Sequence, residues 1–572
     1  MGQGRPERGG ADMARTVGIG IQSFEKIREN NCFYVDKTKF IKEWWEKRDD
    51  VTLITRPRRF GKTLTMSMVE RFFSVQYADR GEVFQGLSIW EEETYRELQG
   101  TYPVISLSFA GVKEKDYPST IRRINQILFE LYHDYSFLTE SDCMPPEEKA
   151  HFHSISEDMQ ETTATIAIHR LSKYLYKYFN KKVIILLDEY DTPMQEAYVN
   201  GYWEELVSFT RSMFNLTFKT NPYLERAIMT GITRVSRESI FSDLNNLKVV
   251  TTTSDEYADC FGFTEKEVFA ALDECGMSAQ KQEVKRWYDG FTFGSYTDIY
   301  NPWSILNYLD TGKLSAYWAN SSSNSLVGKL IREGNRDIKQ KFESLMQGEA
   351  FRVEIDEQIV YGELNTKRNS IWSLLLANGY LKALQVEFIE ETGRWYYHLA
   401  LTNKEVRIMF NNMIRGWFSE QEENYNDFIK ALLADDVKAM NYYMNKVALA
   451  TFSSFDVGNK PSKEAEPERF YHGFVLGLLV DLADRYTMTS NRESGFGRYD
   501  VMLEPKKGDA GIILEFKVQD GEDEKELSDT VKAALEQIEE KQYAAALMEK
   551  GVPGDRIRSY GFAFCGKKVL IG

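Results

Sequence analysis

The stretch from Val51 to Met68 constrains the fold more than any other part of the chain. It begins with a short apolar run, VTLIT, passes through a tight turn, and continues into a segment whose apolar residues recur every three or four positions. This pattern predicts a buried strand, a loop and an amphipathic helix in direct succession. Such a unit belongs in an α/β domain whose parallel sheet is covered by helices.

The loop within this stretch predicts phosphate binding, because it ends in Gly61-Lys62-Thr63. Backbone N–H groups at the start of the following helix can surround phosphate oxygens, a lysine can reach the β- and γ-phosphates, and a hydroxyl can ligate Mg²⁺. Arg56 stands where the motif's first glycine would be, so the match is partial. We expect ATP and Mg²⁺ as cofactors, with Thr63 as a metal ligand. The loop residues expected at the nucleotide are Arg58, Arg59, Phe60, Gly61, Lys62, Thr63 and Leu64.

A second strong pattern, KKVIILLDEYD, covers residues 181–191. Five consecutive branched apolar residues predict a parallel strand that is covered on both faces, and open α/β sheets bind ligands at the carboxyl ends of such strands. Asp188 is therefore expected to hold Mg²⁺ and Glu189 to polarise the attacking water. The alternative is a buried strand that ends in a solvated acidic turn. The lysine-bearing loop earlier in the chain argues against that alternative.

A third strand is predicted by the apolar run that starts at Arg226. Thr233 at its end is expected to sense the γ-phosphate. Arg234 or Arg237 is expected to stabilise charge in the transition state, within one chain or from a neighbouring subunit. A surface arginine in a loop is an equally good interpretation of Arg234 taken alone. If the arginine acts between subunits, copies of the chain form a homo-oligomer.

Composition bounds the class of protein. At 572 residues the chain exceeds one cooperative core, and two to four domains are expected. The net charge of −16 argues against an unselective nucleic-acid coat but is compatible with a local basic groove. Five scattered cysteines without a CxxC pair predict a reducing compartment and no zinc site. No apolar run reaches the length of a membrane span, so we expect a cytoplasmic protein without a membrane partner.

The last part of the chain predicts a second site. Two strand patterns flank a turn rich in Lys and Gly, which indicates a β-hairpin; alternation then places Glu515 and Lys517 on one face and Phe516 on the other. Asp500 on the partner strand is expected to bring its carboxylate beside Glu515. Two carboxylates that hold Mg²⁺ or Mn²⁺, with a lysine that orients or activates water, suit attack on a phosphodiester. The alternative is an ordinary cross-strand ion pair. Gln537 and Tyr543 in the next helix are expected to face either this site or a DNA backbone.

Four motifs in order support a resemblance. Residues 34–38 (YVDKT), 56–63 (RPRRFGKT), 187–191 (LDEYD) and 300–304 (YNPWS) together resemble the bacterial AAA-ATPase-like family, whose members often end in a PD-(D/E)XK nuclease domain. The resemblance implies that an arginine at position 56 is usual. It implies that Asp500, Glu515 and Lys517 are the nuclease catalytic residues, with Glu468, Asp500 and Glu515 as metal ligands. Tyr499 occupies the position where this superfamily usually has proline.

The resemblance and the composition together predict the domain order. We expect a leader at 1–15, a P-loop ATPase core at 16–255 with a parallel sheet, a helical lid at 256–325, a mostly helical linking region at 326–455 and a restriction-endonuclease-like α/β domain at 456–572. Within the linking region, a strand pair is predicted at 380–388 and 395–402.

The leading functional hypothesis is an ATPase with a metal-dependent nuclease domain, acting on DNA rather than RNA, in defence or mobile-element biology. The alternative is a nucleotide-regulated sensor whose C-terminal domain binds without cleaving. The net charge and the acidic segment 520–526 favour the sensor. The intact set of Asp500, Glu515 and Lys517 favours the nuclease, because a module that only binds does not need these groups together. A motor or remodelling protein is a third possibility, for which the sequence names no protein substrate.

Overall fold

The computed structural model divides the chain into two compact units, Met1–Ser322 with Arg352–Val406, and Ser323–Phe351 with Arg407–Gly572. The residues that the structure describes are 15–233, 241, 244–319, 321, 325–333, 336–355, 369–417, 422–452, 482, 485–490, 493–494, 497–498, 500–519, 524, 526–565 and 568–572.

Five parallel strands form the central sheet of the first unit, in the order β2-β3-β4-β1-β5. Every residue of β1 and β3 is buried, as the apolar runs predict. Because β4 lies between β1 and β3, the loop after β1 and the carboxylates after β3 open at the same edge of the sheet. The strands are β1 (Val51–Thr55), β2 (Val104–Ser108), β3 (Val183–Asp188), β4 (Leu224–Gly231) and β5 (Leu247–Val250).

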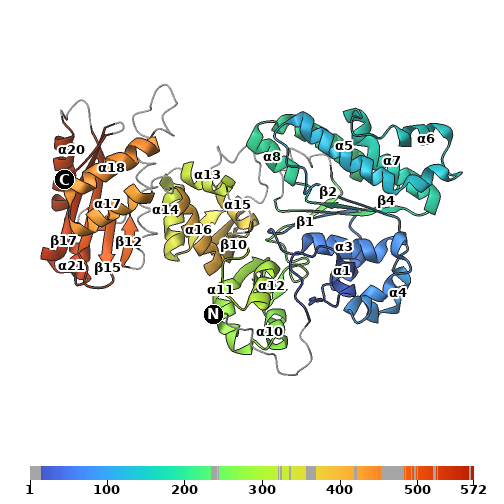
Figure 1. The fold of residues 1–572 in the computed structure, drawn as a ribbon, viewed down its shortest axis with the longest axis horizontal. Coiled ribbons are helices and arrows are strands. Elements are labelled where there is room, and N and C mark those ends of the chain that lie inside the picture. The colour runs from blue at the N-terminus through green and yellow to red at the C-terminus, as the bar shows by residue number, and fades with distance from the viewer. Residues whose placement is uncertain are drawn as a thin grey trace, which may run out of the picture. The chain divides into compact units, whose positions relative to one another are not determined.

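Helices cover both faces of this sheet. In Figure 1, α5 and α7 lie along one face, and α3 lies along the other with α1 and α4. Val69 and Phe72 of α3 pack in one core with Ile184 and Leu186 of β3, so the three- and four-residue spacing predicted the buried side of α3 correctly. The helices are α1 (Phe24–Glu29), α2 (Lys39–Lys47), α3 (Lys62–Phe73), α4 (Glu93–Leu98), α5 (Tyr117–Asp134), α6 (Pro146–His153), α7 (Glu161–Phe179), α8 (Thr192–Asn200) and α9 (Trp203–Phe214).

The segment expected to be a helical lid also contains a small antiparallel sheet, in the order β6-β8-β7. Besides the expected helices, the segment forms strands, because alternating aromatic residues, Phe291 and Phe293, are buried from a strand. The elements are β6 (Phe263–Thr264), α10 (Glu265–Glu274), α11 (Lys281–Tyr288), β7 (Asp289–Phe293), β8 (Tyr296–Tyr300) and α12 (Pro302–Thr311).

The predicted strand pair in the linking region is confirmed, since β10 and β11 form an antiparallel hairpin joined by β9. It belongs to the first unit, so the region expected at 326–455 is divided between the two units. The chain there approaches β7 closely: a side chain at Gly290, whose φ is +133°, would meet the Thr402 carbonyl at 2.0 Å. The elements are β9 (Phe351–Glu354), α15 (Ser370–Ala377), β10 (Leu381–Ile389) and β11 (Arg394–Leu401).

The second unit contains a mixed sheet in the order β12-β15-β16-β17-β18. The predicted hairpin is β15 and β16, and β16 pairs in parallel with β17. Leu514 and Phe516 share a core with residues of α17 and α18, whereas Ile513 packs against Ile538 of α20. The strands are β12 (Tyr486–Ser490), β13 (Glu493–Ser494), β14 (Gly497–Arg498), β15 (Val501–Pro505), β16 (Gly511–Val518), β17 (Ile557–Cys565) and β18 (Lys568–Ile571).

Among the described residues, no helix combines the length and apolar character that crossing a membrane requires. The remaining helices are α13 (Ser325–Glu333), α14 (Arg336–Gln347), α16 (Lys404–Trp417), α17 (Glu422–Ala434), α18 (Val437–Phe452), α20 (Leu527–Glu540) and α21 (Ala545–Glu549).

Candidate active sites

The loop between β1 and α3 is shaped by two residues with left-handed backbone, Arg59 at φ 64° and Gly61 at φ 82°. Glycine adopts this conformation freely, whereas an arginine must be held in it by its surroundings. Lys62 begins α3 and is buried, and its Nζ donates to the carbonyls of Arg56 and Pro57, each at 2.9 Å. Burial lowers the pKa of Lys62, and nearby carboxylates oppose this shift. A buried ammonium whose hydrogen-bond partners are neutral carbonyls fits an incoming phosphate.

Thr63 and Asp188 meet at the edge of the sheet, as the sequence predicts for two groups that share Mg²⁺. The Thr63 hydroxyl donates to Oδ2 of Asp188 at 2.7 Å, and the Thr230 hydroxyl at the end of β4 donates to Oδ1. The sequence motifs did not identify Thr230 as a site residue. Its position at the end of β4, the strand between β1 and β3, would have indicated it. Oxygen donors of this kind suit Mg²⁺.

Glu189 follows Asp188 directly and has an unusual backbone conformation, with φ 52°. Its Oε2 accepts a 3.1 Å hydrogen bond from the Thr192 hydroxyl. A non-glycine residue in the left-handed region at the end of a central strand is typical of a site where the surrounding structure over-determines the backbone. Its predicted role with the attacking water stays a prediction.

Two residues of the loop point away from the nucleotide side. Arg56 is fully buried, and its guanidinium donates to the carbonyls of Thr55, Thr251 and Glu256. Phe60 is buried edge-to-face against Phe291 and Phe293, with ring centroids at 4.8 and 5.3 Å. The side chain of Phe60 therefore packs the loop against β7. The predicted contact of Phe60 with the nucleotide is then limited to its backbone N–H.

Thr233 also differs from its predicted role. It is fully buried, and its hydroxyl and its N–H donate to Oδ2 of Asp191 at 2.9 and 2.8 Å. Burial raises the pKa of Asp191, and these hydrogen bonds oppose the shift. Thr233 thus joins the end of β4 to the residues after β3 instead of presenting a free hydroxyl. Arg234, the proposed charge clamp, lies outside the described residues.

The remaining loop residues lie close to α12. The Arg59 guanidinium lies over the ring of Trp303, 4.4 Å from its centroid, and the Arg58 carbonyl accepts a hydrogen bond from Asn301. Leu64 on α3 packs against the core that the helix shares with the sheet. The nucleotide contacts predicted for Arg58, Arg59 and Leu64 stay predictions.

The second unit brings Asp500 and Glu515 together across β15 and β16. The Asp500 N–H donates to Oε2 of Glu515 at 3.3 Å, and the Phe516 N–H donates to Oδ2 of Asp500 at 2.9 Å. Glu515 is buried, and Nε2 of Gln537 on α20 donates to its Oε1 and to the Tyr543 hydroxyl at 3.2 Å. The predicted convergence of the two carboxylates is therefore present in the structure.

The electrostatics of this site disfavour the ionised form of Glu515. Burial and the Asp500 carboxylate raise the pKa of Glu515 well above its usual range, while Lys517 acts in the opposite direction. Two adjacent carboxylates that resist joint ionisation fit a divalent cation, which would restore their charge balance. The structure places Lys517 on the same strand face two residues further along β16. Glu468, the expected third metal ligand, lies outside the described residues.

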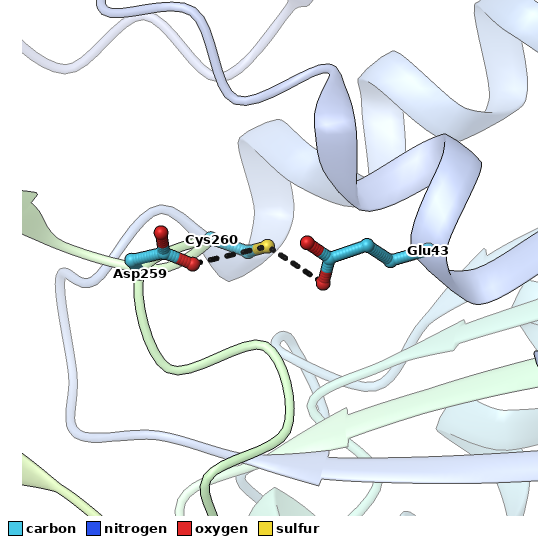
Figure 2. Close-up of side chains that lie close together, drawn as sticks. All are labelled: Glu43, Asp259 and Cys260. Atoms are coloured by element: carbon cyan, nitrogen blue, oxygen red, sulfur yellow. Dashed lines mark hydrogen bonds between the residues drawn. The ribbon is translucent and has the colours of Figure 1, made fainter. Parts of the chain in front are cut away.

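A further group of possible ligand atoms has a simpler explanation. Figure 2 shows Cys260 between Asp259 and Glu43, with its thiol within 3.9 and 3.7 Å of the two carboxylates. Lys39 pairs with Asp259 and lies 3.9 Å from Glu43, so a side chain supplies positive charge there. Burial and Glu43 raise the pKa of the thiol, which disfavours the thiolate that binds metals.

The fold and the two groups of side chains define a P-loop domain joined in one chain to a nuclease-type α/β domain. Residues 18–241 match the family model described as "Predicted AAA-ATPase". Residues 466–572 match the model of the PD-(D/E)XK nuclease superfamily. The chain carries an AAA-ATPase-like domain and a C-terminal PD-(D/E)XK nuclease superfamily domain, as the motifs predicted.

The chain is also similar over almost its full length to one curated protein. It is 26% identical over 548 residues to the "Uncharacterized protein in vnfD 5'region" of Azotobacter chroococcum mcd 1. The match covers 94% of each chain. The similarity therefore extends across the combination of the two domains and is not confined to one of them.

Proposed function

We propose that this protein hydrolyses ATP in its first unit and cleaves nucleic acid phosphodiesters in its second unit with a divalent cation. The observation that carries the proposal is the contact between Asp500 and the buried Glu515, because a module that only binds gains nothing from placing two carboxylates where they resist joint ionisation. The matches to an ATPase family and a nuclease superfamily support it.

The first unit would bind ATP through the loop after β1. Lys62 would exchange its carbonyl partners for the β- and γ-phosphates, and Thr63 and Asp188 would hold Mg²⁺. Mg²⁺ would neutralise charge on the phosphates. Glu189 would orient the attacking water, and the hydrogen bond from Thr192 would fix its carboxylate.

The second unit would act on the phosphodiester. Asp500 and Glu515 would hold Mg²⁺ or Mn²⁺, which would lower the pKa of a bound water. Lys517 would orient that water and offset the charge that develops on the phosphate. Gln537 would keep the Glu515 carboxylate in place through the bond to Oε1. DNA is the expected substrate, and self-assembly of the chain is part of the proposal.

A substrate panel tests the proposal. The purified protein is incubated with single- and double-stranded DNA and with RNA, in Mg²⁺ or Mn²⁺, with and without ATP. We expect metal-dependent cleavage of DNA and release of phosphate from ATP. If the protein binds nucleic acid but cleaves none under any of these conditions, the nuclease hypothesis fails and the nucleotide-regulated sensor takes its place.

Metal binding to the second unit is expected to weaken as the pH falls. A carboxyl group with a raised pKa retains its proton at pH values where an ordinary glutamate has lost it, so the metal must displace that proton. We expect Mn²⁺ affinity to fall by up to about tenfold per unit between about pH 8 and about pH 6. Calorimetry in two buffers of different ionisation enthalpy measures both affinity and proton release. An affinity that is independent of pH would contradict the assignment of Glu515.

A further inference from the structure

The motif at residues 300–304 contacts the loop between β1 and α3 through Asn301 and Trp303. Asn301 caps α12: its Oδ1 accepts from the N–H groups of Trp303 and Ser304 at 2.9 and 3.4 Å. Its Nδ2 donates to the Arg58 carbonyl at 3.2 Å. Nε1 of Trp318 donates to the same carbonyl at 3.0 Å. One carbonyl of the loop therefore accepts two side-chain donors from outside the loop.

The next loop residue is held from the same helix. The Arg59 guanidinium lies over the Trp303 ring and forms a favourable cation–π contact with it. Arg59 has φ 64°, a conformation that L residues with a side chain disfavour. The contacts at Arg58 and Arg59 together fix a strained part of the loop.

A buried carboxylate joins the first turn of α12 to the backbone of Trp318. Glu405 is fully buried, and its oxygens accept from the Ser304 hydroxyl at 2.9 and 3.1 Å and from the Trp318 N–H at 2.6 Å. Burial raises the pKa of Glu405 to about 7. The Trp318 ring also packs on Phe291 and Tyr380, with centroids at 5.2 and 5.6 Å. Glu405 takes part in no proposed catalytic step, and its hydrogen bonds to Ser304 and Trp318 give it a structural role.

We propose that Asn301 and Trp318 are positioning residues for the nucleotide, because they hold the Arg58 carbonyl and so keep the loop in the shape that presents its N–H groups to phosphate. This inference rests on the proposed ATP binding. Lys62 now holds the Arg56 and Pro57 carbonyls, and it must release them to reach a phosphate. The bonds to the Arg58 carbonyl do not involve Lys62.

The test uses variants that remove one donor each. Asn301→Asp keeps the capping oxygen and removes Nδ2, and Trp318→Phe keeps a ring and removes Nε1–H. Asn307→Asp is the matched control, because Nδ2 of Asn307 donates at 2.7 Å to the Trp303 carbonyl within α12. Binding of a fluorescent ATP analogue with Mg²⁺, steady-state kcat and KM, and the melting midpoint of the nucleotide-free protein are measured for each full-length variant.

We expect about tenfold weaker ATP affinity and a raised KM for Asn301→Asp and for Trp318→Phe, and wild-type values for Asn307→Asp. Wild-type affinity in both test variants would overturn the inference and leave the proposed function standing. Loss of affinity that follows the fall in melting midpoint across all three variants would assign the residues to folding alone and would also overturn it. If the wild-type protein binds no ATP, the proposed function fails, and the inference fails with it.

Discussion

Replacing Glu515 with glutamine is expected to abolish nucleic acid cleavage while ATP hydrolysis continues at the wild-type rate. The change removes a charged metal ligand but keeps an oxygen that can accept from Gln537. We expect cleavage to fall on the order of 10³-fold, because both metal binding and water activation depend on the carboxylate. The rate of fragment release from an end-labelled duplex measures the effect.

The control for this variant is Glu504→Gln on the neighbouring strand β15. Glu504 forms an ion pair with Lys550 at the surface, so the control removes the same charge outside the site. Glu515→Gln is not expected to lower the melting midpoint of the metal-free protein, because burial and the Asp500 carboxylate disfavour the ionised form of Glu515. Wild-type cleavage by Glu515→Gln would show that the catalytic assignment is wrong.

Replacing Lys62 with alanine is expected to reduce ATP hydrolysis by at least about 100-fold. Lys62 is the buried cation at the start of α3, and its loss removes the group proposed to bind the β- and γ-phosphates. Phosphate release at saturating ATP measures the rate.

Lys42→Ala is the matched control for this experiment. Lys42 lies on α2 and pairs with Glu92 at the surface, away from the loop. It should hydrolyse ATP at the wild-type rate. Full hydrolysis by Lys62→Ala would contradict the assignment of the loop after β1 as the nucleotide site.

Local patterns explain why much of the fold was predictable. The apolar runs of β1 and β3 and the helical spacing of α3 depend on near neighbours in the sequence. Thr63 and Asp188 could be placed together because parallel strands end at one edge of a sheet. Asp500 and Glu515 could be paired because alternation along a hairpin fixes which side chains share a face.

Side chains with distant partners were not predictable in this way. The Arg56 guanidinium donates to the carbonyls of Thr251 and Glu256, which lie 195 and 200 residues further along the chain. No local sequence pattern predicts these contacts. Thr233 lies at the end of its strand as expected, but its hydroxyl is taken by Asp191, whose orientation depends on the packing after β3. Asn301 and Trp318 contact Arg58 across 243 and 260 residues, so only the folded chain shows their connection to the loop.

We propose that one chain carries two separable activities, and a paired assay on the same preparations distinguishes them. Phosphate release from ATP and cleavage of labelled DNA in Mn²⁺ are measured for the wild type, Lys62→Ala and Glu515→Gln. We expect the wild type to show both activities, Lys62→Ala to lose ATP hydrolysis, and Glu515→Gln to lose cleavage alone. Cleavage that survives in Glu515→Gln, or that is absent from the wild type in every metal, would contradict this proposal.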